Sequence, residues 1–467
     1  MKKIVIYILS ISFIFLSSCT GSRTKKLDEL PNVVFIVIDT LRSDHLPFYG
    51  YSENTAPFLN ELAKEGVVFN NTYSASSWTA PATASIFTSL YPFQHRVILN
   101  MLATMMFNKN NPDYRIKLNR IPKEIVTLGE SFKDKGYATF GFADNVNIGK
   151  KEGFDQGFDK FYTFNYKRGK HLNEIVLNHS KEIKKSGKYF VYIHYMDVHQ
   201  PNHENSDWLM GKEIAKISVK DSGEFNIKKK IKNETLFYDG EINYVDRRIK
   251  ELFEHFKWKK NTLVIMTADH GEELWDHGRW GHGYSLYKEV TKVPMFFYYS
   301  GDKKNYFKKG SAEQNVSTID ILPTLRDFIG LKKDSANEGV SLLKILENGE
   351  KEKTNNRFIF SHLFKKRIVS PNVDGFEAYS VINGNYSFIK SLPGQKRMFK
   401  LMFFDLKKDP EQKNNIFKTN IVKANKLRSR FIKFYKVCRK FKKDIVNYTS
   451  NKKEMEKLKT LGYIDNK

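Results

Sequence analysis

The sequence predicts an α/β fold: a mixed, mostly parallel sheet with helices on both faces, followed by a small C-terminal α+β subdomain. Three observations predict it. Continuous apolar runs rich in β-branched residues recur along the chain, as in Val33–Ile38. Helical stretches separate these runs, and polar residues follow directly after three of them. Strands buried on both faces by helices are continuously apolar, so this alternation favours a sheet between two helical layers.

The expected elements follow one another in a simple order. Strands are predicted at 33–38, 190–193 and 263–266, and helices at 56–65, 125–136 and 242–256. After about Leu346 the chain becomes rich in Lys, Asn and Glu, and short strands are expected at 378–382 and 386–389. A basic helical tail from about Ile421 is interpreted as a capping helix rather than a membrane-surface helix, because Lys and Arg interrupt every face. The predicted units are a signal segment 1–19, a tether 20–31, a main domain 32–350, a subdomain 351–420 that completes the fold, and the tail 421–467.

The N-terminus predicts export and lipid attachment. Two lysines precede an apolar run from Ile4 to Leu16, which is shorter than the ~20 residues that a membrane-spanning helix needs. The run ends in Leu16-Ser17-Ser18-Cys19, which resembles a bacterial lipobox. We therefore expect an exported lipoprotein, anchored through Cys19 on the periplasmic or cell-surface side of a membrane. Lipidation of Cys19 would leave Cys438 alone, so no intramolecular disulfide is expected.

The net charge is +26 over 467 residues, 40% of which are hydrophobic. Such a charge suits an anionic lipid or glycan as a partner. It also fits a composition that is heavy in Lys, Asn and Ile throughout, and the wide spread of the basic residues favours this second explanation. No nucleic-acid motif accompanies the charge, so a nucleic-acid partner is not predicted.

The polar residues after the apolar runs predict one site. Asp39, Asp197 with His199, and Asp269 with His270 each follow a predicted strand. In open α/β sheets ligands bind at the carboxyl ends of the strands, so these side chains are expected to converge. Carboxylate and imidazole ligands suit a borderline divalent cation. His282, flanked by two glycines, is a further candidate.

A hydroxyl residue supplies the candidate nucleophile. Thr79 lies two positions before Pro81, ahead of a helix of small residues that is expected to extend to Pro92. A nucleophile at a helix N-terminus gains from the dipole and from free backbone N–H groups that bind an anionic ester. The alternative for Thr79 is an ordinary Ser/Thr N-cap.

Taken together, these residues resemble the sulfatase-like family of the alkaline phosphatase superfamily, and the resemblance covers nearly the whole chain after the tether. It implies an alkaline phosphatase-like fold and a metal-dependent ester hydrolase. The motifs that carry it, in chain order, are Asp39 to His45, Thr79 to Pro92, Tyr195 to His199, Tyr238 to Ile242 with Asp246, Asp269 to Glu273, Ile319 to Thr324 and Phe404 to Glu411.

Two departures from the family pattern concern the substrate. Thr79 stands where sulfatases place the cysteine or serine that becomes formylglycine, and Thr83 stands where they have arginine. Formylglycine hydrate expels sulfate by reforming its aldehyde, which threonine cannot do, whereas phosphothreonine can be attacked in line at a metal site. Phosphate mono- or diesters are therefore the expected substrates. The alternatives are a sulfatase acting without formylglycine, a phosphoethanolamine- or phosphoglycerol-type transferase, and a non-catalytic binding protein.

The resemblance also implies roles for the site residues. Asp39, Asp269 and His270 would hold one divalent cation beside Thr79. His199 and His282 would protonate the leaving group or, with Asp197, bind a second cation. Thr40 stands where many sulfatases have a second acid, which argues against their calcium site, and His270 stands where they often have an amide, which favours zinc or manganese; calcium is also compatible. His95 could contact the substrate, although a packed histidine is the favoured interpretation.

Overall fold

A computed structural model describes residues 29–98, 115–164, 166–200, 224–301, 306–349, 357–365, 376–391 and 401–449. The predicted signal segment, with Cys19, lies outside the described residues. Within the described residues, no helix combines the length and the apolar character needed to cross a membrane.

A nine-stranded sheet forms the centre of the molecule, in the order β10-β2-β11-β7-β1-β6-β4-β5, with β12 beside β2. β1 lies between β7 and β6 and pairs in parallel with both. The three strands whose ends were predicted to converge are therefore neighbours. The strand bounds are β1 Asn32–Ile38, β2 Val67–Tyr73, β4 Ala138–Ala143, β5 Lys160–Thr163, β6 Tyr189–Tyr195, β7 Thr262–Thr267, β10 Lys292–Val293, β11 Met295–Tyr299 and β12 Gly310–Ser317.

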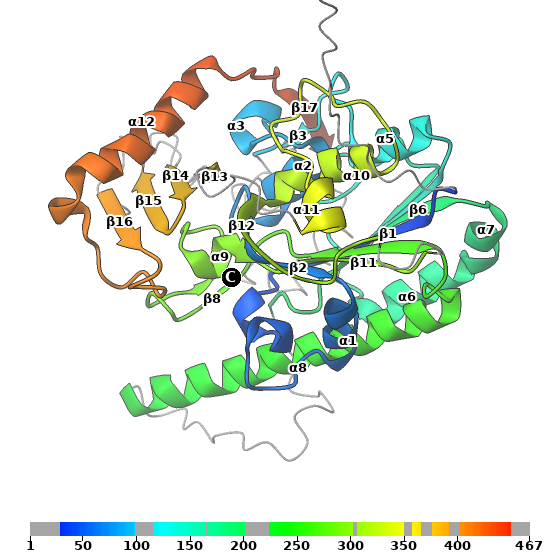
Figure 1. Cartoon of the computed structure of the whole chain (residues 1–467), viewed down its shortest axis with the longest axis horizontal. Coiled ribbons are helices and arrows are strands. Elements are labelled where there is room, and N and C mark those ends of the chain that lie inside the picture. Colours follow the sequence, from blue (N-terminus) through cyan, green and yellow to red (C-terminus); the bar gives the residue numbers. More distant parts are fainter. Residues whose placement is uncertain are drawn as a thin grey trace, which may run out of the picture.

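Helices cover both faces of this sheet, as predicted (Figure 1). Alternate residues of β1 enter different cores: Val33 and Phe35 pack in one, and Val34 and Ile36 pack in the other. Every residue from Val33 to Ile38 is buried, which explains the continuously apolar run. One face carries α2 Thr79–Thr88, α5 Leu128–Asp134, α10 Ile321–Phe328 and α11 Leu343–Asn348, and the other carries α1 Pro57–Glu65, α6 Arg168–Asn178 and α8 Glu224–Phe256.

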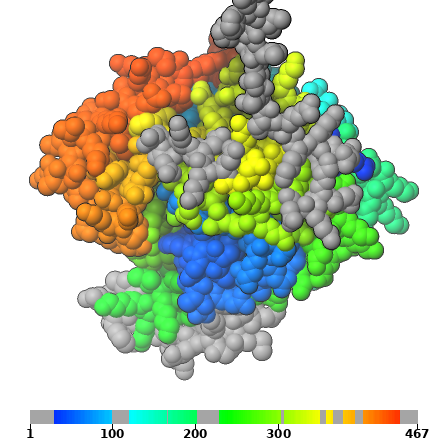
Figure 2. Space-filling model, in the orientation of Figure 1, coloured from blue at the N-terminus to red at the C-terminus, as the bar shows by residue number. Residues whose placement is uncertain are grey.

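The C-terminal subdomain is an antiparallel sheet, β13-β14-β15-β16, with α12 Ile421–Val437 packed on it (Figure 1). Its strands are β13 Phe358–Lys365, β14 Phe376–Asn383, β15 Tyr386–Ser391 and β16 Leu401–Asp405. Ala424, Leu427 and Phe431 of α12 are buried against this sheet. The basic helix therefore caps the subdomain, which lies against the main body on one side of the face seen in Figure 2 (orange).

The structure corrects three element boundaries. The helix that begins at Thr79 ends at Thr88, because Ser89 adopts a left-handed conformation with φ 55°, and a separate short helix α3 covers Pro92–His95. The tail is not helical throughout, since β17 Asp444–Thr449 pairs with β3 Arg115–Arg120. α8 begins well before the predicted Ile242.

Candidate active site

Three ligand atoms meet at the carboxyl edge of the sheet. Asp39 follows β1, and Asp269 and His270 follow β7, the parallel neighbour of β1. Nε2 of His270 lies 3.6 Å from Oδ1 of Asp39 and 3.5 Å from Oδ2 of Asp269. All three side chains are fully buried. Among the described residues, this is the one group of three or more His, Cys, Asp or Glu side chains with the geometry to hold a metal ion.

The hydrogen bonds around these atoms fit a cation. Oδ1 of Asp39 and Oδ2 of Asp269 are buried and accept no hydrogen bond from the protein. Nδ1 of His270 lies 2.9 Å from the carbonyl oxygen of Gly271, which can only accept, so Nδ1 carries the proton and the lone pair of Nε2 faces the carboxylates. Two unpaired carboxylate oxygens and one imidazole lone pair around one point form a donor set for a divalent cation.

Thr79 joins this cluster from the N-terminus of α2. Its Oγ1 lies 3.3 Å from Nε2 of His270 and 3.4 Å from Oδ2 of Asp39. The side chain is 4% exposed, so the hydroxyl is accessible but held in place. The position is fixed by the loop of His282, because the backbone N–H of Gly283 donates to the carbonyl of Ser77, two residues before Thr79. Gly283 has φ 71°, a conformation that favours glycine.

Two residues that the sequence analysis missed hold the other oxygen of Asp39. Nδ2 of Asn145 donates to Oδ2 of Asp39 at 2.7 Å, and Nε2 of His194 lies 3.2 Å from the same oxygen. Asn145 follows β4, so its place just after a strand was a signal in the sequence. His194 lies inside the buried strand β6, where a histidine within an apolar run was the signal. Together they orient Asp39 so that Oδ1 faces the ligand cluster.

Burial shifts the pKa values of the cluster in opposite directions. For Asp39, burial alone would raise the pKa, but the hydrogen bond from His194 and the neighbouring imidazoles lower it below its usual range. Burial and the charge of Asp39 raise the pKa of Asp269. Burial, reinforced by the neighbouring His282, lowers the pKa of His270 to about 3. His270 is therefore neutral, as a metal ligand must be.

A second layer of histidines faces the cluster. The ring centroid of His282 lies 4.5 Å from that of His270 and 4.9 Å from that of His199. Nδ1 of His282 lies 2.9 Å from Oε1 of Glu272, a buried carboxyl whose pKa burial raises to about 7. Nδ1 of His199 lies 2.6 Å from the carbonyl of Gln200, and burial lowers the pKa of His199. In both rings the contact of Nδ1 fixes the orientation of the imidazole beside the cluster.

Asp197 does not join the histidines in a three-ligand group within the described part of the chain. Its Oδ1 accepts the backbone N–H of Gly169 at 3.0 Å and lies 3.4 Å from Nε of Arg168. Arg168 in turn donates two hydrogen bonds to Glu241. Asp197 thus ties the start of α6 to β6, and the second cation, one of the two roles that the resemblance left open for these side chains, stays a prediction.

His95 is a packed histidine rather than a substrate contact. Its side chain is fully buried, with Nε2 3.0 Å from Oγ of Ser85 and Nδ1 accepting the N–H of Val97 at 3.1 Å. Burial lowers its pKa to about 3. Both ring nitrogens are thus used inside the protein, which agrees with the favoured interpretation of a packed histidine and not with the alternative of a substrate contact.

The fold and the site define a class. A sheet covered by helices on both faces, with a donor set for a divalent cation beside a hydroxyl at a helix N-terminus, is the arrangement of a metal-dependent ester hydrolase. Residues 31–331 match the family model described as Sulfatase, and residues 275–437 match the model described as N-sulphoglucosamine sulphohydrolase, C-terminal. The first match spans more than half of the chain, and the chain therefore belongs to the sulfatase family.

Similar proteins agree with this assignment. A delta 4,5-hexuronate-2-O-sulfatase of Bacteroides thetaiotaomicron is 23% identical over 438 residues, which cover 84% of this chain and 85% of the relative. A solved 2-O GAG sulfatase has a TM-score of 0.68 at 19% identity and covers 89% of this chain and 95% of its own. A phosphonate monoester hydrolase from Silicibacter pomeroyi has a TM-score of 0.68 at 18% identity and covers 90% of this chain and 96% of its own. These structures confirm the alkaline phosphatase-like fold that the sequence predicted.

Proposed function

We propose that the chain hydrolyses sulfate esters without formylglycine, using the hydroxyl of Thr79 as the nucleophile. The observation that carries this proposal is the contact of Thr79 Oγ1 with Nε2 of His270 and Oδ2 of Asp39, two members of the candidate metal cluster. A hydroxyl at this place attacks in line an ester whose charged oxygens are bound at the same point. The reaction type follows from the site, and the choice of ester is argued separately below.

Asp39, Asp269 and His270 would hold the cation. When bound, it would supply a Lewis acid that lowers the pKa of the Thr79 hydroxyl and neutralises charge on the ester. The N-terminus of α2 adds a positive dipole end and free backbone N–H groups on the same side. Asn145 and His194 keep Asp39 in one orientation, so the cluster needs little rearrangement during the reaction.

The covalent step transfers the sulfuryl group to Thr79. The hydroxyl of Thr79 loses its proton to solvent, and Oγ1 forms a bond to sulfur while the bond from sulfur to the leaving oxygen breaks. His282, with Glu272 on its Nδ1, is placed to donate the proton that the leaving oxygen takes up. Water then attacks the sulfur of the threonyl ester, and the bond from sulfur to Oγ1 breaks. One proton of the water returns to Oγ1 of Thr79 and the other to His282, and sulfate is released.

The names of the relatives favour a sulfate ester as the substrate, whereas a threonine nucleophile favours a phosphorus ester. The phosphate ester expected from the sequence is therefore the second candidate rather than the first. The hexuronate 2-O-sulfatase and the GAG sulfatase act on sulfated sugars according to their names. Thr79 lacks the second hydroxyl of a formylglycine hydrate, so its sulfate can leave only by attack at sulfur. In-line displacement at a metal site is the usual reaction of phosphate esters, and the phosphonate monoester hydrolase shares the fold.

A paired set of esters separates the two candidates. The purified chain would be assayed with 4-nitrophenyl sulfate, 4-nitrophenyl phosphate, its diester and its phenylphosphonate, each with zinc, manganese or calcium. Sulfate cleavage at the highest kcat/KM supports the first proposal. Cleavage of phosphorus esters alone would replace sulfate with phosphate and leave the role of Thr79 standing.

We also propose that the chain is an exported lipoprotein held to a membrane through Cys19. The support is the sequence of residues 1–19, a basic start, an apolar run and a lipobox-like end. Metabolic labelling with an alkyne fatty acid, followed by fractionation, tests it with Cys19→Ser as the control. A label that persists in Cys19→Ser would contradict the assignment of the anchor.

A further inference from the structure

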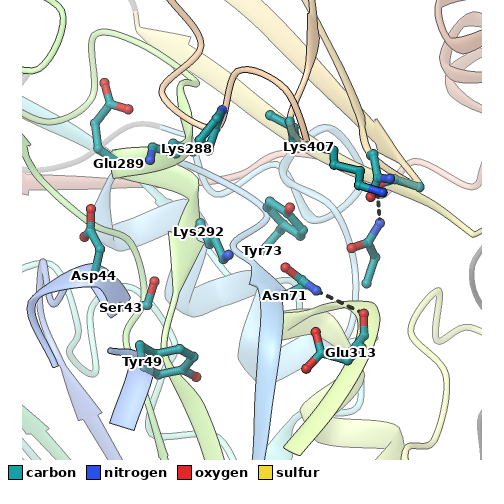
Figure 3. Close-up of a pocket in the computed structure, with 15 residues that line it drawn as sticks. Ser43, Asp44, Tyr49, Asn71, Tyr73, Lys288, Glu289, Lys292, Glu313 and Lys407 are labelled. Atoms are coloured by element: carbon teal, nitrogen blue, oxygen red, sulfur yellow. Dashed lines mark hydrogen bonds between the residues drawn. The ribbon is translucent and has the colours of Figure 1, made fainter. Parts of the chain in front are cut away.

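A cavity lies outside the catalytic site. It measures about 580 Å³, within the range of ~300–1,000 Å³ that is usual for ligand pockets. Its wall comes from β2, α9 Lys288–Thr291, β10 and β12 of the main domain and from the turns that follow β14 and β16 of the subdomain. None of the metal-cluster residues, nor Thr79 or His282, lines it. Figure 3 shows its side chains pointing toward a shared space.

One backbone segment separates this cavity from the catalytic site. Glu289 lines the cavity, and its carbonyl oxygen lies so close to Gly271 that a Cβ on Gly271 would stand 2.0 Å away. The N–H of Gly271 donates to the carbonyl of the next residue, Val290, at 3.1 Å. Gly271 directly follows the metal-cluster residue His270. The cavity is therefore a neighbour of the catalytic site, on the other side of α9.

The charges of the cavity leave cations available for a ligand. The three acidic residues that line the cavity already have partners. Asp44 forms an ion pair with Arg42, and Glu289 contacts Nδ1 of His277. Glu313 accepts a hydrogen bond from the side chain of Asn70. Lys292 and Lys407 have no ion-paired or hydrogen-bonded side-chain partner among the residues that the structure describes, although they line the same space. A pair of uncommitted ammonium groups favours an anion.

Lys292 lies at the centre of this arrangement. It is partly buried at the edge strand β10, and Figure 3 draws it between Ser43 and Tyr73. Burial lowers the pKa of Lys292, and the charge of Lys288 lowers it further, while the charges of Asp44 and Glu313 act in the opposite direction without offsetting the shift. An anion beside the amine would remove this penalty.

The rest of the lining suits hydroxyl groups. Asn71 and Asn315 have their amide nitrogens fixed on the carbonyls of Glu313 and Gly384, at 3.0 and 2.8 Å, so their side-chain oxygens are oriented acceptors. The ring of Tyr73 offers an apolar face with a polar tip. Fixed amides, an aromatic ring and cations form a polar pocket with room for more than an inorganic ion.

We propose that this cavity binds an anionic saccharide unit, with its carboxylate or sulfate at Lys292 and its hydroxyls at Asn71, Asn315 and Tyr73. Lys407, exposed at the rim, would contact the same acidic group or the next one along a chain. Binding here does not depend on which ester the catalytic site cleaves. If the chain binds the saccharide but cleaves no ester, the reaction proposed above is wrong and this binding site still stands.

Calorimetric titration of the full chain tests the site, with glucose 6-sulfate and glucuronate as probes. Thr79→Val is present throughout to prevent turnover. Lys292→Met should weaken binding of both probes by about tenfold or more, because it removes the charged hydrogen bond to their acidic group. Lys181→Met, which removes an exposed lysine of α7 Ser180–Lys185, should leave binding unchanged. Glucose, which lacks the charge, should bind at least about tenfold more weakly than glucose 6-sulfate.

Several outcomes would overturn the site. The site would be excluded if Lys292→Met bound the probes with the same affinity as its parent. It would also be excluded if neither probe gave a heat of binding. Inorganic sulfate that binds as tightly as glucose 6-sulfate would exclude a saccharide pocket and leave only an ion site. If Lys292→Met fails to fold, the exposed Lys407→Met takes its place, and a loss of about threefold or more is expected from a partly screened charge.

Discussion

The hydroxyl of Thr79 and the imidazole of His270 are in direct contact, with Oγ1 3.3 Å from Nε2. Because Nδ1 of His270 donates to Gly271, the nitrogen that faces Thr79 carries a lone pair rather than a proton. One atom of the metal cluster therefore touches the proposed nucleophile. This contact joins the two halves of the site, the ligand atoms at the sheet edge and the hydroxyl on α2.

Thr79→Val should abolish turnover. Valine keeps the shape of threonine and removes only Oγ1, so the fold and the cluster remain while the nucleophile is lost. We expect kcat/KM to fall by roughly 10³-fold or more. Thr79→Ser is the matched control and should retain most of the activity, since it keeps the hydroxyl. Turnover by Thr79→Val close to that of the parent would show that water attacks the ester directly.

Removal of metal should lower the melting temperature, because the carboxylates of Asp39 and Asp269 then face each other without a cation. Restoring zinc or manganese to the chelated protein should raise Tm by a few °C, as expected for a ligand that binds the folded state alone. Asp269→Asn should lose most of this response. An equal rise in Asp269→Asn would place the cation elsewhere.

Asn145→Ala should weaken metal binding without removing a ligand. Nδ2 of Asn145 fixes Oδ2 of Asp39, and groups that orient a metal ligand typically change affinity by ~10–100-fold. The metal concentration for half-maximal activity should rise by about tenfold, with kcat largely recovered at saturation. A lower Tm with an unchanged metal requirement would indicate that Asn145 only stabilises the fold.

The sequence predicted the parts of this site that follow strands and missed the parts that depend on packing. Asp39, Asp269 and His270 could be assigned because the carboxyl ends of parallel strands meet at one edge. His194 could not be assigned, because an interior strand position does not reveal whether a histidine is packed or contacts a functional group. The same ambiguity explains His95, where only the structure shows that both nitrogens are engaged by Ser85 and Val97.

Long-range pairing was equally hidden. β17 pairs with β3 across more than three hundred residues of sequence, and no local pattern in the basic tail indicated a strand. The helix boundary at Ser89 depends on one residue with positive φ that is not glycine. Such boundaries are set by tertiary contacts, here the bond from Ser89 to the carbonyl of Ile319, rather than by propensity.

His282→Ala should impair poor leaving groups more than good ones. If His282 protonates the leaving oxygen, its loss matters little for 4-nitrophenolate and much for an alkyl or sugar alcohol. We expect a fall of about tenfold for 4-nitrophenyl esters and of about 10²-fold or more for methyl or sugar esters. Glu272→Gln, which removes the carboxylate next to Nδ1 of His282, should also lower activity more for methyl or sugar esters than for 4-nitrophenyl esters, with smaller losses for both. Equal losses for all esters would assign His282 to binding instead.

The burial of His95 should make the protein sensitive to acid. Its pKa is about 3 in the folded chain and ~6.5 when unfolded, so the unfolded state binds the proton first. The stability that neutral His95 contributes is fully present above pH ~6.5 and is lost as the pH falls toward 3, at a rate approaching ~1.4 kcal/mol per pH unit.

His95→Gln should remove this part of the pH dependence, because glutamine can donate to or accept from Ser85 and Val97 without titrating. The difference in Tm between the parent and His95→Gln should therefore shrink or reverse between pH 7 and pH 5, both measured with the same metal. His171→Gln, at a side chain that is 45% exposed, should follow the parent across this range. If the Tm difference between parent and His95→Gln stays constant with pH, His95 is protonated inside the folded chain, and its packing with Ser85 must then be that of an imidazolium.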